Sequence, residues 1–556
     1  MLKIWKILEK VERKNLVILL FLIIFSVLFE LLSIGLIIPF TSIVLTESSH
    51  FSSFFNNFEF LKNLNNTQLT LFVCFIILLV FLIKNLFLSF FYYFEGYFLN
   101  STIHNTSSRI FSNIIKGKLV YNNEFHSSEI VNDLTKEVVM FGNFLSACTL
   151  ILTEIPIIIC LSLLVLFYET DIFLILFFIT GISTLIYFII VKDKIKIIGR
   201  LRKKNEEVKL KYLQEGLAGI KEIKIYEKES FFINKYREMS FKIAKNYYKF
   251  NFYSKFARLF FELIFILLVV VIIIFFTYKS VKPSDYLPFL TLLFVASFRI
   301  MPGLNRIVSS LQTYVYTKIA METVYKKLSS EKNTKNIKEN KVDRVDKIDI
   351  KDVFFKYKDK NYILKNFSKT INKGDILAIS GKSGSGKSTL LDLITGFKIP
   401  NEGNIYFDDY NNNLQSKNFF KQISYVPQSI FLFDDSIKNN IIFNDIENFD
   451  EKKFQFSIKI SKLDDLLNRL PDRENTHVGE IGKKISGGEK QRIGIARAVY
   501  KNPDILILDE ATNALDSETE EQIFSELQKF VNKKKILIFV SHKEELLKYS
   551  NKTVQL

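Results

Sequence analysis

A glycine-rich loop, GKSGSGKS at Gly381–Ser388, carries the residues best suited to chemistry. It fits the pattern G-x-x-x-x-G-K-[ST] in full, and the strand DILAIS and the helix TLLDLITG flank it as that pattern requires. Because glycines allow backbone N–H groups to curl around phosphates, the loop predicts a nucleotide site. The predicted phosphate-binding residues are Gly381, Lys382, Ser383, Gly384, Ser385, Gly386, Lys387, Ser388 and Thr389.

Two side chains of this loop and two later carboxylates are the expected reactive groups. Lys387 is expected to reach the β- and γ-phosphates, and Ser388 is expected to ligate Mg²⁺. The run ILILDE at Ile505–Glu510 fits a strand that is buried on both faces and ends in two carboxylates. Asp509 would hold the Mg²⁺ through water, and Glu510 would polarise the attacking water as general base. Adjacent residues of a strand point to opposite faces, so the two carboxylates are expected to play different roles.

The composition shows that a second, very different part accompanies this site. Apolar residues make up 48% of the 556-residue chain, which excludes disorder, and charged residues make up 24%, which excludes a chain lying wholly in lipid. Residues 15–310 hold the long apolar runs, whereas residues 330–556 have the pattern of a water-soluble α/β domain. Much of the net charge of +17 falls in loops between apolar runs, so no nucleic-acid partner is expected.

Six segments are long and apolar enough to cross a bilayer, which takes ~20 residues. They are residues 15–46, 68–100, 143–167, 172–191, 259–278 and 286–310. Lys and Arg are concentrated in the intervening segments 1–14, 101–142 and 192–258, and they are sparse in the alternate ones. This asymmetry predicts a multi-pass membrane protein with both termini in the cytoplasm.

Two short amphipathic segments flank the first span. Residues 1–14 fit either an interfacial helix on the inner leaflet or the start of the first span. Residues 51–64 are expected to lie on the outer leaflet. The N-terminal segment places four apolar side chains on one helical face, with Trp5 and lysines beside them: Ile4, Ile7, Leu8 and Val11.

Ionisable side chains inside or at the edges of the predicted spans are few, and such groups usually face a cavity or a partner. Lys84, Arg258 and Arg299, placed around one cavity, would suit an anionic substrate. Snorkelling to the interface is the alternative for Lys84 and Arg258, but it is weaker for Arg299, which lies mid-segment beside Pro302. Acidic side chains are instead expected to form Glu–Arg pairs that fix helix packing: Glu30, Glu154 and Glu262.

The neighbours of the ILILDE strand carry a family resemblance. ISGGEKQR at Ile485–Arg492 resembles the signature loop of ATP-binding cassette (ABC) proteins, and further matches follow in the family's order. Tyr357, in VFFKY, resembles the aromatic that stacks on adenine, and Gln428, in SYVPQ, resembles the Q-loop glutamine. Asn513–Asp516, NALD, resembles the D-loop, and His542, in VSH, resembles the switch histidine that contacts the γ-phosphate.

The resemblance implies ATP hydrolysis with ATP and Mg²⁺ as cofactors and with Glu510 and His542 as catalytic residues. The implied Mg²⁺ ligands are Ser388, Gln428 and Asp509, and the implied further ATP contacts are Tyr357, Gln428, Ser486, Gly487, Gly488 and Asp516. In this family the signature residues come from the opposing protomer. One cassette per chain therefore implies a homodimer with two ATP molecules sandwiched between the chains.

The sequence departs from the family pattern at three points. Glu489 stands where Gln is commonest, and Lys543 follows His542 where Arg is usual. The chain ends at Leu556, earlier than most cassettes.

Six spans followed by one cassette resemble an exporter-type half-transporter. The expected fold is an α-helical transmembrane domain with six helices, exporter type, followed by an α/β P-loop NTPase nucleotide-binding domain. The expected transmembrane domain covers residues 1–328, the charged linker 329–347 and the ABC domain 348–556. The segments 125–137 and 215–232 resemble coupling helices, which would dock on a cassette.

The membrane half is similar to one subgroup, the ATP-driven flippase of lipid-linked oligosaccharides in bacterial N-glycosylation. FELLSIGLIIPF at 29–40 and FRIMPGLNRI at 298–307 are similar to its first and sixth spans. Lys84, Arg258 and Arg299 fall where that flippase carries arginines thought to engage the lipid pyrophosphate. The resemblance implies a protein of the bacterial cytoplasmic (inner) membrane that flips a polyprenyl-diphosphate-linked oligosaccharide outward.

Other functions remain open at this point. An exporter of another lipid, a drug or a peptide would use the same ATP machinery. A soluble cassette protein is excluded by the six spans. A gated channel or a non-hydrolysing binding module is disfavoured by the intact Glu510 and His542.

Overall fold

The computed structural model describes residues 2–35, 66–116, 127–166, 170–278, 283–329, 344–357, 361–411, 417–532 and 534–556. The chain forms two compact units, a helical one within residues 1–333 and an α/β one that contains Thr334–Leu556. The predicted amphipathic segment 51–64, the linker residues 330–343 and the end of the first predicted span lie outside the described residues.

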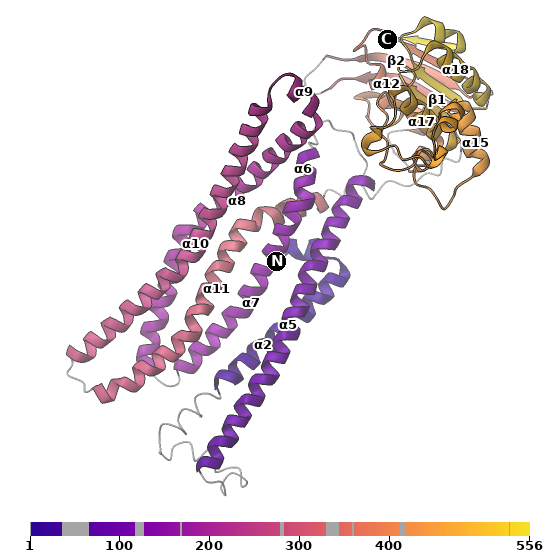
Figure 1. The fold of residues 1–556 in the computed structure, drawn as a ribbon. Coiled ribbons are helices and arrows are strands. Elements are labelled where there is room, and N and C mark those ends of the chain that lie inside the picture. The colour runs from indigo at the N-terminus through magenta and orange to yellow at the C-terminus, as the bar shows by residue number, and fades with distance from the viewer. Residues whose placement is uncertain are drawn as a thin grey trace. The chain divides into compact units, whose positions relative to one another are not determined.

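The helical unit is built from long helices that run side by side (Figure 1). Each predicted apolar segment lies in a separate long helix, as far as the structure describes it. Because a bilayer takes ~20 helical residues, helices of 51 residues (α5), 49 (α8), 50 (α10) and 47 (α11) must extend well beyond it. The elements are α1 (Leu2–Ile7), α2 (Lys10–Gly35), α5 (Asn66–Lys116), α6 (Ser127–Asn132), the π-helix η2 (Asp133–Glu137), α7 (Val138–Leu166), α8 (Thr170–Ala218), α9 (Ile220–Ile225), α10 (Glu229–Tyr278) and α11 (Pro283–Ser329).

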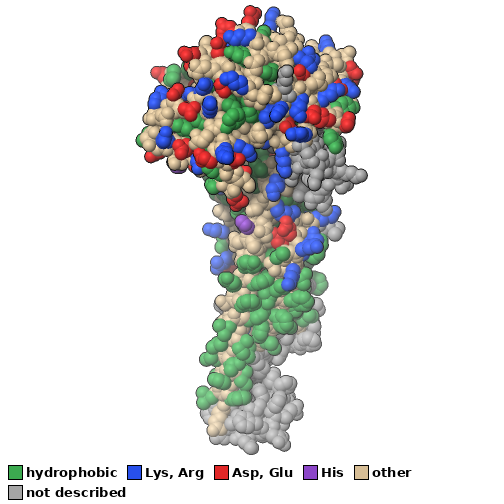
Figure 2. All heavy atoms as spheres, turned by 90° about the vertical axis from the view of Figure 1, so that its right-hand side faces the viewer, with side chains coloured by type: hydrophobic (Ala, Val, Ile, Leu, Met, Phe, Trp, Pro, Cys, Tyr) green, Lys and Arg blue, Asp and Glu red, His purple; other side chains and the backbone are tan. Residues whose placement is uncertain are grey.

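The surface of the helical unit exposes many large apolar side chains, as expected for helices that contact lipid. Figure 2 shows hydrophobic side chains covering much of one face of the helices, with charged side chains gathered toward one end of them. Leu86 and Ile274, for example, are 66% and 62% exposed. Within the described residues, four helical stretches are long and apolar enough to span a membrane: Lys10–Ser33, Cys74–Lys116, Ser127–Cys160 and Glu229–Tyr278. The chain is therefore a multi-pass membrane protein.

The N-terminal segment forms a separate short helix, α1, that packs on protein. Ile4, Ile7 and Leu8 are buried in a cluster with residues of α5, α7 and α11. The backbone N–H of Glu9 donates to the Glu12 carboxylate at 2.8 Å, which caps the start of α2. Ile4, Ile7 and Leu8 therefore meet the bundle whereas Val11 is exposed, and residues 10–14 begin the helix that holds the first span, as one of the two expectations has it.

A buried ionic cluster joins α8 to the π-helix η2. The Arg202 guanidinium, fully buried, lies 3.0 Å from Glu137 and 3.1 Å from Glu206. Nearby, Asp133 pairs with Lys203 of α8 at 3.5 Å and with a lysine of α11 at 3.1 Å. We call Glu137, Arg202 and Glu206 the Arg202 cluster. The carboxylates of Asp133 and Glu137 thus point into the bundle and are buried, and docking of segment 125–137 on a cassette stays a prediction.

The second expected coupling segment has the exposed apolar character that was predicted. The short helix α9 joins the ends of α8 and α10 (Figure 1). Its neighbourhood exposes large apolar side chains that find no cover within the described part of the helical unit: Leu217, Ile220, Ile225, Tyr226 and Phe231.

The α/β unit contains two sheets, and the parallel one positions the site. Its five strands run in the order β6-β7-β8-β3-β9 and pair in parallel throughout. Residues at the carboxyl ends of parallel strands meet at one edge of the sheet, so the loops after β3, β6, β7 and β8 converge there. The strands are β3 (Ile376–Ser380), β6 (Ile423–Val426), β7 (Ile505–Asp509), β8 (Ile536–Val540) and β9 (Lys552–Gln555). As expected, all five residues of β7 are buried.

The second sheet is antiparallel, and helices complete the unit. Its order is β2-β1-β4-β5, with β1 (Lys347–Phe355), β2 (Leu364–Asn372), β4 (Glu402–Phe407) and β5 (Tyr410–Asn411). The α-helices are α12 (Lys387–Ile394), α13 (Lys417–Gln422), α14 (Ile437–Ile442), α15 (Glu451–Ile460), α16 (Asp464–Arg469), α17 (Gly487–Tyr500) and α18 (Ser517–Val531). Single turns of 3-10 helix lie at Arg473–Asn475 and Glu480–Gly482, and a longer one at Glu544–Tyr549.

Candidate nucleotide site

The glycine-rich loop connects β3 to α12 with the backbone geometry that its glycines allow. Gly384 and Gly386 have φ values of 81° and 105°, in the left-handed region that disfavours other residues. A Cβ atom at Gly386 would also lie 2.5 Å from the side chain of Ile363. The Lys387 ammonium turns back over the loop and donates to the carbonyl oxygens of Gly381 and Lys382, each at 3.0 Å.

These features fit a bound phosphate chain. The buried hydroxyl oxygen of Ser385 has no hydrogen-bond partner among the described residues. The first N–H groups of α12 lack helical partners and carry the positive end of the helix dipole, which favours anions. Lys387 places a cation beside them. The loop therefore presents one unsatisfied hydroxyl, a helix N-terminus and an ammonium to the same place.

Asp509, at the end of β7, lies in a different environment from its neighbour Glu510. Burial raises the pKa of its carboxyl, and hydrogen bonds from Tyr425 and Ser388 oppose that rise. The Tyr425 hydroxyl donates to it at 2.9 Å. Ser388 and Asp509 thus bring two oxygen donors together, which fits Mg²⁺. When bound, the ion would neutralise charge on the phosphates.

Glu510 leaves the strand pattern and collects hydrogen bonds from three loops. Its φ of 50° turns the chain away from β7, so its carboxylate faces other partners than Asp509 does. The amides of Gln428 and Asn513 donate to one oxygen at 2.8 and 2.9 Å. The other oxygen lies 3.1 Å from Nε2 of His542. Residues that are up to 114 positions apart in the sequence, Gln428 and His542, meet at one carboxylate.

The signature loop forms an exposed helix N-terminus. Ser486 caps α17 by accepting from the Glu489 backbone N–H, and the Ser486 backbone N–H donates to the Glu489 carboxylate at 2.8 Å. This capping box explains the acidic residue at position 489. A Cβ atom at Gly488 would lie 2.9 Å from the carbonyl oxygen of Ala514, so a glycine is required there. Ser486 and Gly487 are exposed.

Two further residues near the site have structural partners. The carboxylate of Asp516 caps α18 by accepting from the backbone N–H and the hydroxyl of Thr519 at 2.9 and 2.8 Å, which lowers its pKa. Lys543 pairs at 2.5 Å with Glu520, which is buried. The lysine that follows His542 therefore neutralises a buried carboxylate. An ATP contact by Asp516 stays a prediction.

The three predicted cations of the membrane half have different surroundings. Lys84 is buried and pairs with Glu30 at 2.7 Å, while it donates to Ser33 at 3.0 Å. The Lys84 charge is therefore neutralised by Glu30, and a shared cavity for the three cations stays a prediction. Arg258 is exposed on α10, and the side chain of Arg299 on α11 lies outside the described residues.

The acidic residues of the spans behave partly as expected. Glu154 forms a bidentate pair with Arg306, at 2.5 and 3.1 Å, and so joins α7 to α11. Glu30 is also paired, although its partner is a lysine. Glu262 is exposed on α10, and no ion pair joins it to another described residue.

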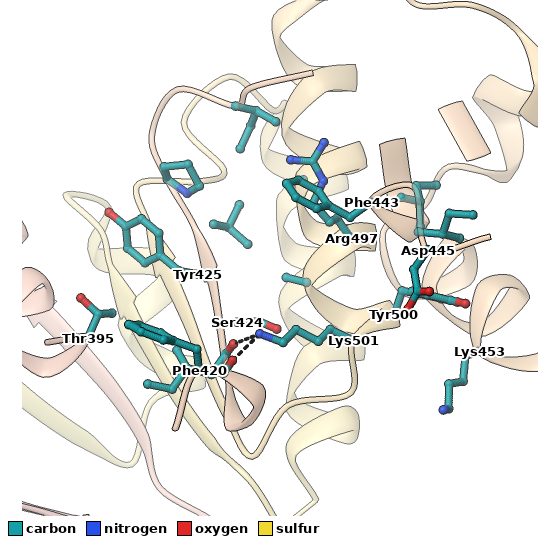
Figure 3. A pocket seen from close by; sticks show the side chains of 18 of the residues that line it. Thr395, Phe420, Ser424, Tyr425, Phe443, Asp445, Lys453, Arg497, Tyr500 and Lys501 are labelled. Carbon is teal, nitrogen blue, oxygen red and sulfur yellow. Dashed lines mark hydrogen bonds between the residues drawn. The ribbon is translucent and has the colours of Figure 1, made fainter. Parts of the chain in front are cut away.

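A groove lies beside the Q-loop between β6 and the helices α14 and α17. It has a volume of about 670 Å³, and Tyr425, Phe443 and Tyr500 are among its aromatic lining residues. Figure 3 shows the side chains of Arg497, on α17, and of Lys501, directly after the end of α17, at this groove. Lys501 donates to backbone carbonyls at 2.5 and 2.6 Å, and burial lowers the pKa of Arg497 to about 10.

Sequence reasoning missed the residues that hold the site residues in place. Tyr425, which binds Asp509, lies three positions before Gln428, and the parallel pairing of β6 with β7 explains its approach. Lys398, which binds the Tyr357 hydroxyl, carried no sequence signal.

Comparisons with known proteins find matches to both parts of the chain. Family models described as "ABC transporter" and "ABC transporter transmembrane region" match residues 364–513 and 16–304. A bacterial Atm1-family ABC exporter, solved with ATP bound, has a similar fold, with a TM-score of 0.77 at 20% identity over 98% of this chain and 93% of that one. The second model covers more than half of the chain.

Curated relatives match over one part of the chain. The mitochondrial iron-sulfur clusters transporter ABCB7 of Oryzias latipes is 40% identical over 194 residues, 35% of this chain and 26% of that protein. The ATP-dependent lipid A-core flippase of Bordetella avium strain 197N is 36% identical over 203 residues, 36% of this chain and 34% of that protein. The matches thus span about a quarter to a third of these relatives' length.

Proposed function

Because the chain belongs to the ABC transporter family, we propose that it is an ATP-hydrolysing exporter. The observation that carries this proposal is the shared carboxylate of Glu510, which binds both Gln428 and His542. In this proposal Glu510 activates water, His542 contacts the γ-phosphate, and Ser388, Gln428 and Asp509 hold Mg²⁺. A general base must be held in a defined orientation, and the contacts with Gln428 and His542 hold the Glu510 carboxylate.

We propose further that two copies of the chain form the working transporter. The P-loop supplies donors on one side of a triphosphate, while transfer of the γ-phosphoryl group needs donors on the other side too. Ser486 and Gly487 are exposed, so they are accessible to the nucleotide of a partner chain. A homodimer would thereby complete both ATP sites.

We propose that the coupling segment 215–232 docks on an ATP-binding unit. What supports this is the exposed apolar surface around α9, which includes Ile225 and Tyr226 at 77% and 71% exposure. The groove beside the Q-loop offers an aromatic lining of suitable chemistry. Attachment next to Gln428 would link ATP hydrolysis to movement of the helical unit.

For the substrate we propose a polyprenyl-diphosphate-linked oligosaccharide, flipped outward across a bacterial inner membrane whose cytoplasmic side holds both termini. Outward movement of about two negative charges against an inside-negative potential of ~100 mV is favourable by roughly 4–5 kcal/mol. The barrier is the transfer of polar sugars through hydrocarbon. Arg258 and Arg299 would attract the diphosphate while the lipid tail stays in the bilayer.

An exporter of another lipid, a drug or a peptide is the second candidate. The pairing of Lys84 with Glu30 favours it, because that pair removes one of the three cations expected to attract an anion.

A transport assay separates these two candidates. In proteoliposomes with fluorescent polyprenyl-diphosphate glycan, we expect ATP-dependent loss of the glycan's accessibility on the cassette side, and no such loss with Glu510→Gln. Intact ATP hydrolysis without glycan movement would eliminate the flippase and retain the exporter.

Replacing Arg299 by Ala is expected to impair flipping more than basal ATP hydrolysis, because the substitution removes a cation from the proposed path and leaves the nucleotide site unchanged. Both rates should be measured in the same proteoliposomes. The matched control is Lys84→Met combined with Glu30→Gln, which removes a paired charge of each sign. Equal loss of flipping and hydrolysis in Arg299→Ala would make Arg299 a structural residue.

A further inference from the structure

Tyr357 is held at the edge of the phosphate-binding loop. Its hydroxyl lies 3.3 Å from the hydroxyl of Thr389, the residue that follows Ser388. Its ring packs edge-on against Phe355 at the end of β1, with ring centres 5.3 Å apart and an interplanar angle of 83°. The ring is half-buried against the core of the α/β unit. An aromatic side chain is therefore fixed directly beside the loop that binds phosphate.

Lys398, four residues after the end of α12, provides the shortest of these contacts. Its ammonium lies 2.6 Å from the Tyr357 hydroxyl and 2.6 Å from the Asp392 carboxylate of α12. Burial lowers the pKa of Lys398, but the hydrogen bonds with Asp392 and Tyr357 outweigh it and raise the pKa overall. The lysine is therefore charged at neutral pH.

The ammonium binds the rim of the tyrosine ring rather than its face. It lies 4.7 Å from the ring centre but only 2.6 Å from the hydroxyl oxygen, so it approaches from the hydroxyl end. A cation centred over the ring would occupy the surface on which a base could stack. The Lys398 contact fixes the ring without covering that surface.

We propose that Lys398 is a positioning residue for nucleotide recognition, which holds the Tyr357 ring ready to stack on the purine base of ATP. Asp392 anchors Lys398 in turn. The inference rests on the proposed function, in which Tyr357 contacts the base. A ring that is already fixed loses little side-chain freedom when the nucleotide binds, so fixing it strengthens binding without altering the chemical step.

The test compares ATP hydrolysis by full-length variants. Lys398→Met should raise KM for ATP about threefold to tenfold, the range expected for loss of one hydrogen bond, with kcat within about twofold. Lys398→Arg, which keeps the charge and donors, should restore much of the affinity. Tyr357→Phe, which keeps the ring and removes only the hydroxyl, should match Lys398→Met.

The double variant gives the sharper result. Because Lys398→Met and Tyr357→Phe break the same hydrogen bond, their combination should raise KM no more than either change alone. The matched control is Lys351→Met, since Lys351 also pairs with an aspartate, at 3.5 Å, and lies over a tyrosine ring, but on β1 with both partners in the antiparallel sheet. That variant should keep the wild-type KM.

The outcomes are distinct. Additive effects in the double variant would overturn the inference. A wild-type KM in Tyr357→Phe would also overturn it, and this measurement does not depend on whether Lys398→Met folds. Absence of ATP hydrolysis by the wild-type protein would instead refute the proposed function.

Discussion

Glu510→Gln is expected to lower steady-state ATP hydrolysis about a hundredfold or more while ATP binding persists, because general-base catalysis contributes roughly that factor. The substitution keeps the shape of the side chain but cannot accept the proton of the attacking water. The neighbours define the orientation of the new amide. Gln428 and Asn513 both donate to one Glu510 oxygen, so the amide oxygen is expected to lie there and the amide nitrogen toward His542. We expect the variant to retain ATP in a closed cassette dimer.

The measurement combines phosphate release with the amount of nucleotide retained after gel filtration. Glu526→Gln is the matched control, because it makes the same isosteric change on α18, where the carboxylate pairs with Lys529 at 2.8 Å. It should hydrolyse ATP at the wild-type rate. Normal turnover by Glu510→Gln would remove Glu510 from the catalytic role.

Arg202→Met is expected to destabilise the helical unit by about 3–5 kcal/mol, the usual cost of removing one partner from a buried ion pair. The Arg202 guanidinium is fully buried and lies within 3.1 Å of both Glu137 and Glu206. Methionine would leave two carboxylates in an apolar interior with no cation from this site. Because Glu137 belongs to η2 and Arg202 to α8, the loss also separates these elements.

Thermal unfolding of the detergent-solubilised protein, with the fraction that stays monodisperse, would measure this effect. Two further variants separate charge from packing. Combining Arg202→Met with Glu137→Gln and Glu206→Gln removes the buried charges together and should recover much of the stability. Lys242→Met breaks an exposed pair with Glu238 and should leave the melting temperature unchanged. A wild-type melting temperature for Arg202→Met would contradict the cluster's structural role.

The backbone geometry of the candidate nucleotide site was predictable because its signals are local. The glycines at Gly384 and Gly386 predict a loop with positive φ values, and the backbone has positive φ at both positions. The apolar run that ends at Asp509 predicts a strand buried on both faces, and all residues of β7 are buried. Parallel pairing then brings Asp509, Gln428 and His542 to one sheet edge, which follows from the order of the strands once they are known.

The partners of ionised groups in the helical unit were only partly predictable. Glu–Arg pairs were expected for Glu30 and Glu154, yet Glu30 pairs with Lys84, and only Glu154 pairs with an arginine, Arg306. Such choices depend on the rotation of each helix about its axis and on its depth, which are set by the packing of many side chains at once.

The sequence by itself determined that this chain combines a membrane-spanning helical part with a phosphate-binding α/β domain, since periodicity, apolar length and glycine spacing act on neighbouring residues. Only the tertiary structure decided that α1 packs on the bundle, that Arg202 neutralises Glu137, and that Lys398 holds Tyr357. Each of these contacts joins residues from separate elements. Their pairing depends on how whole helices and strands pack, which residue spacing along the chain does not encode.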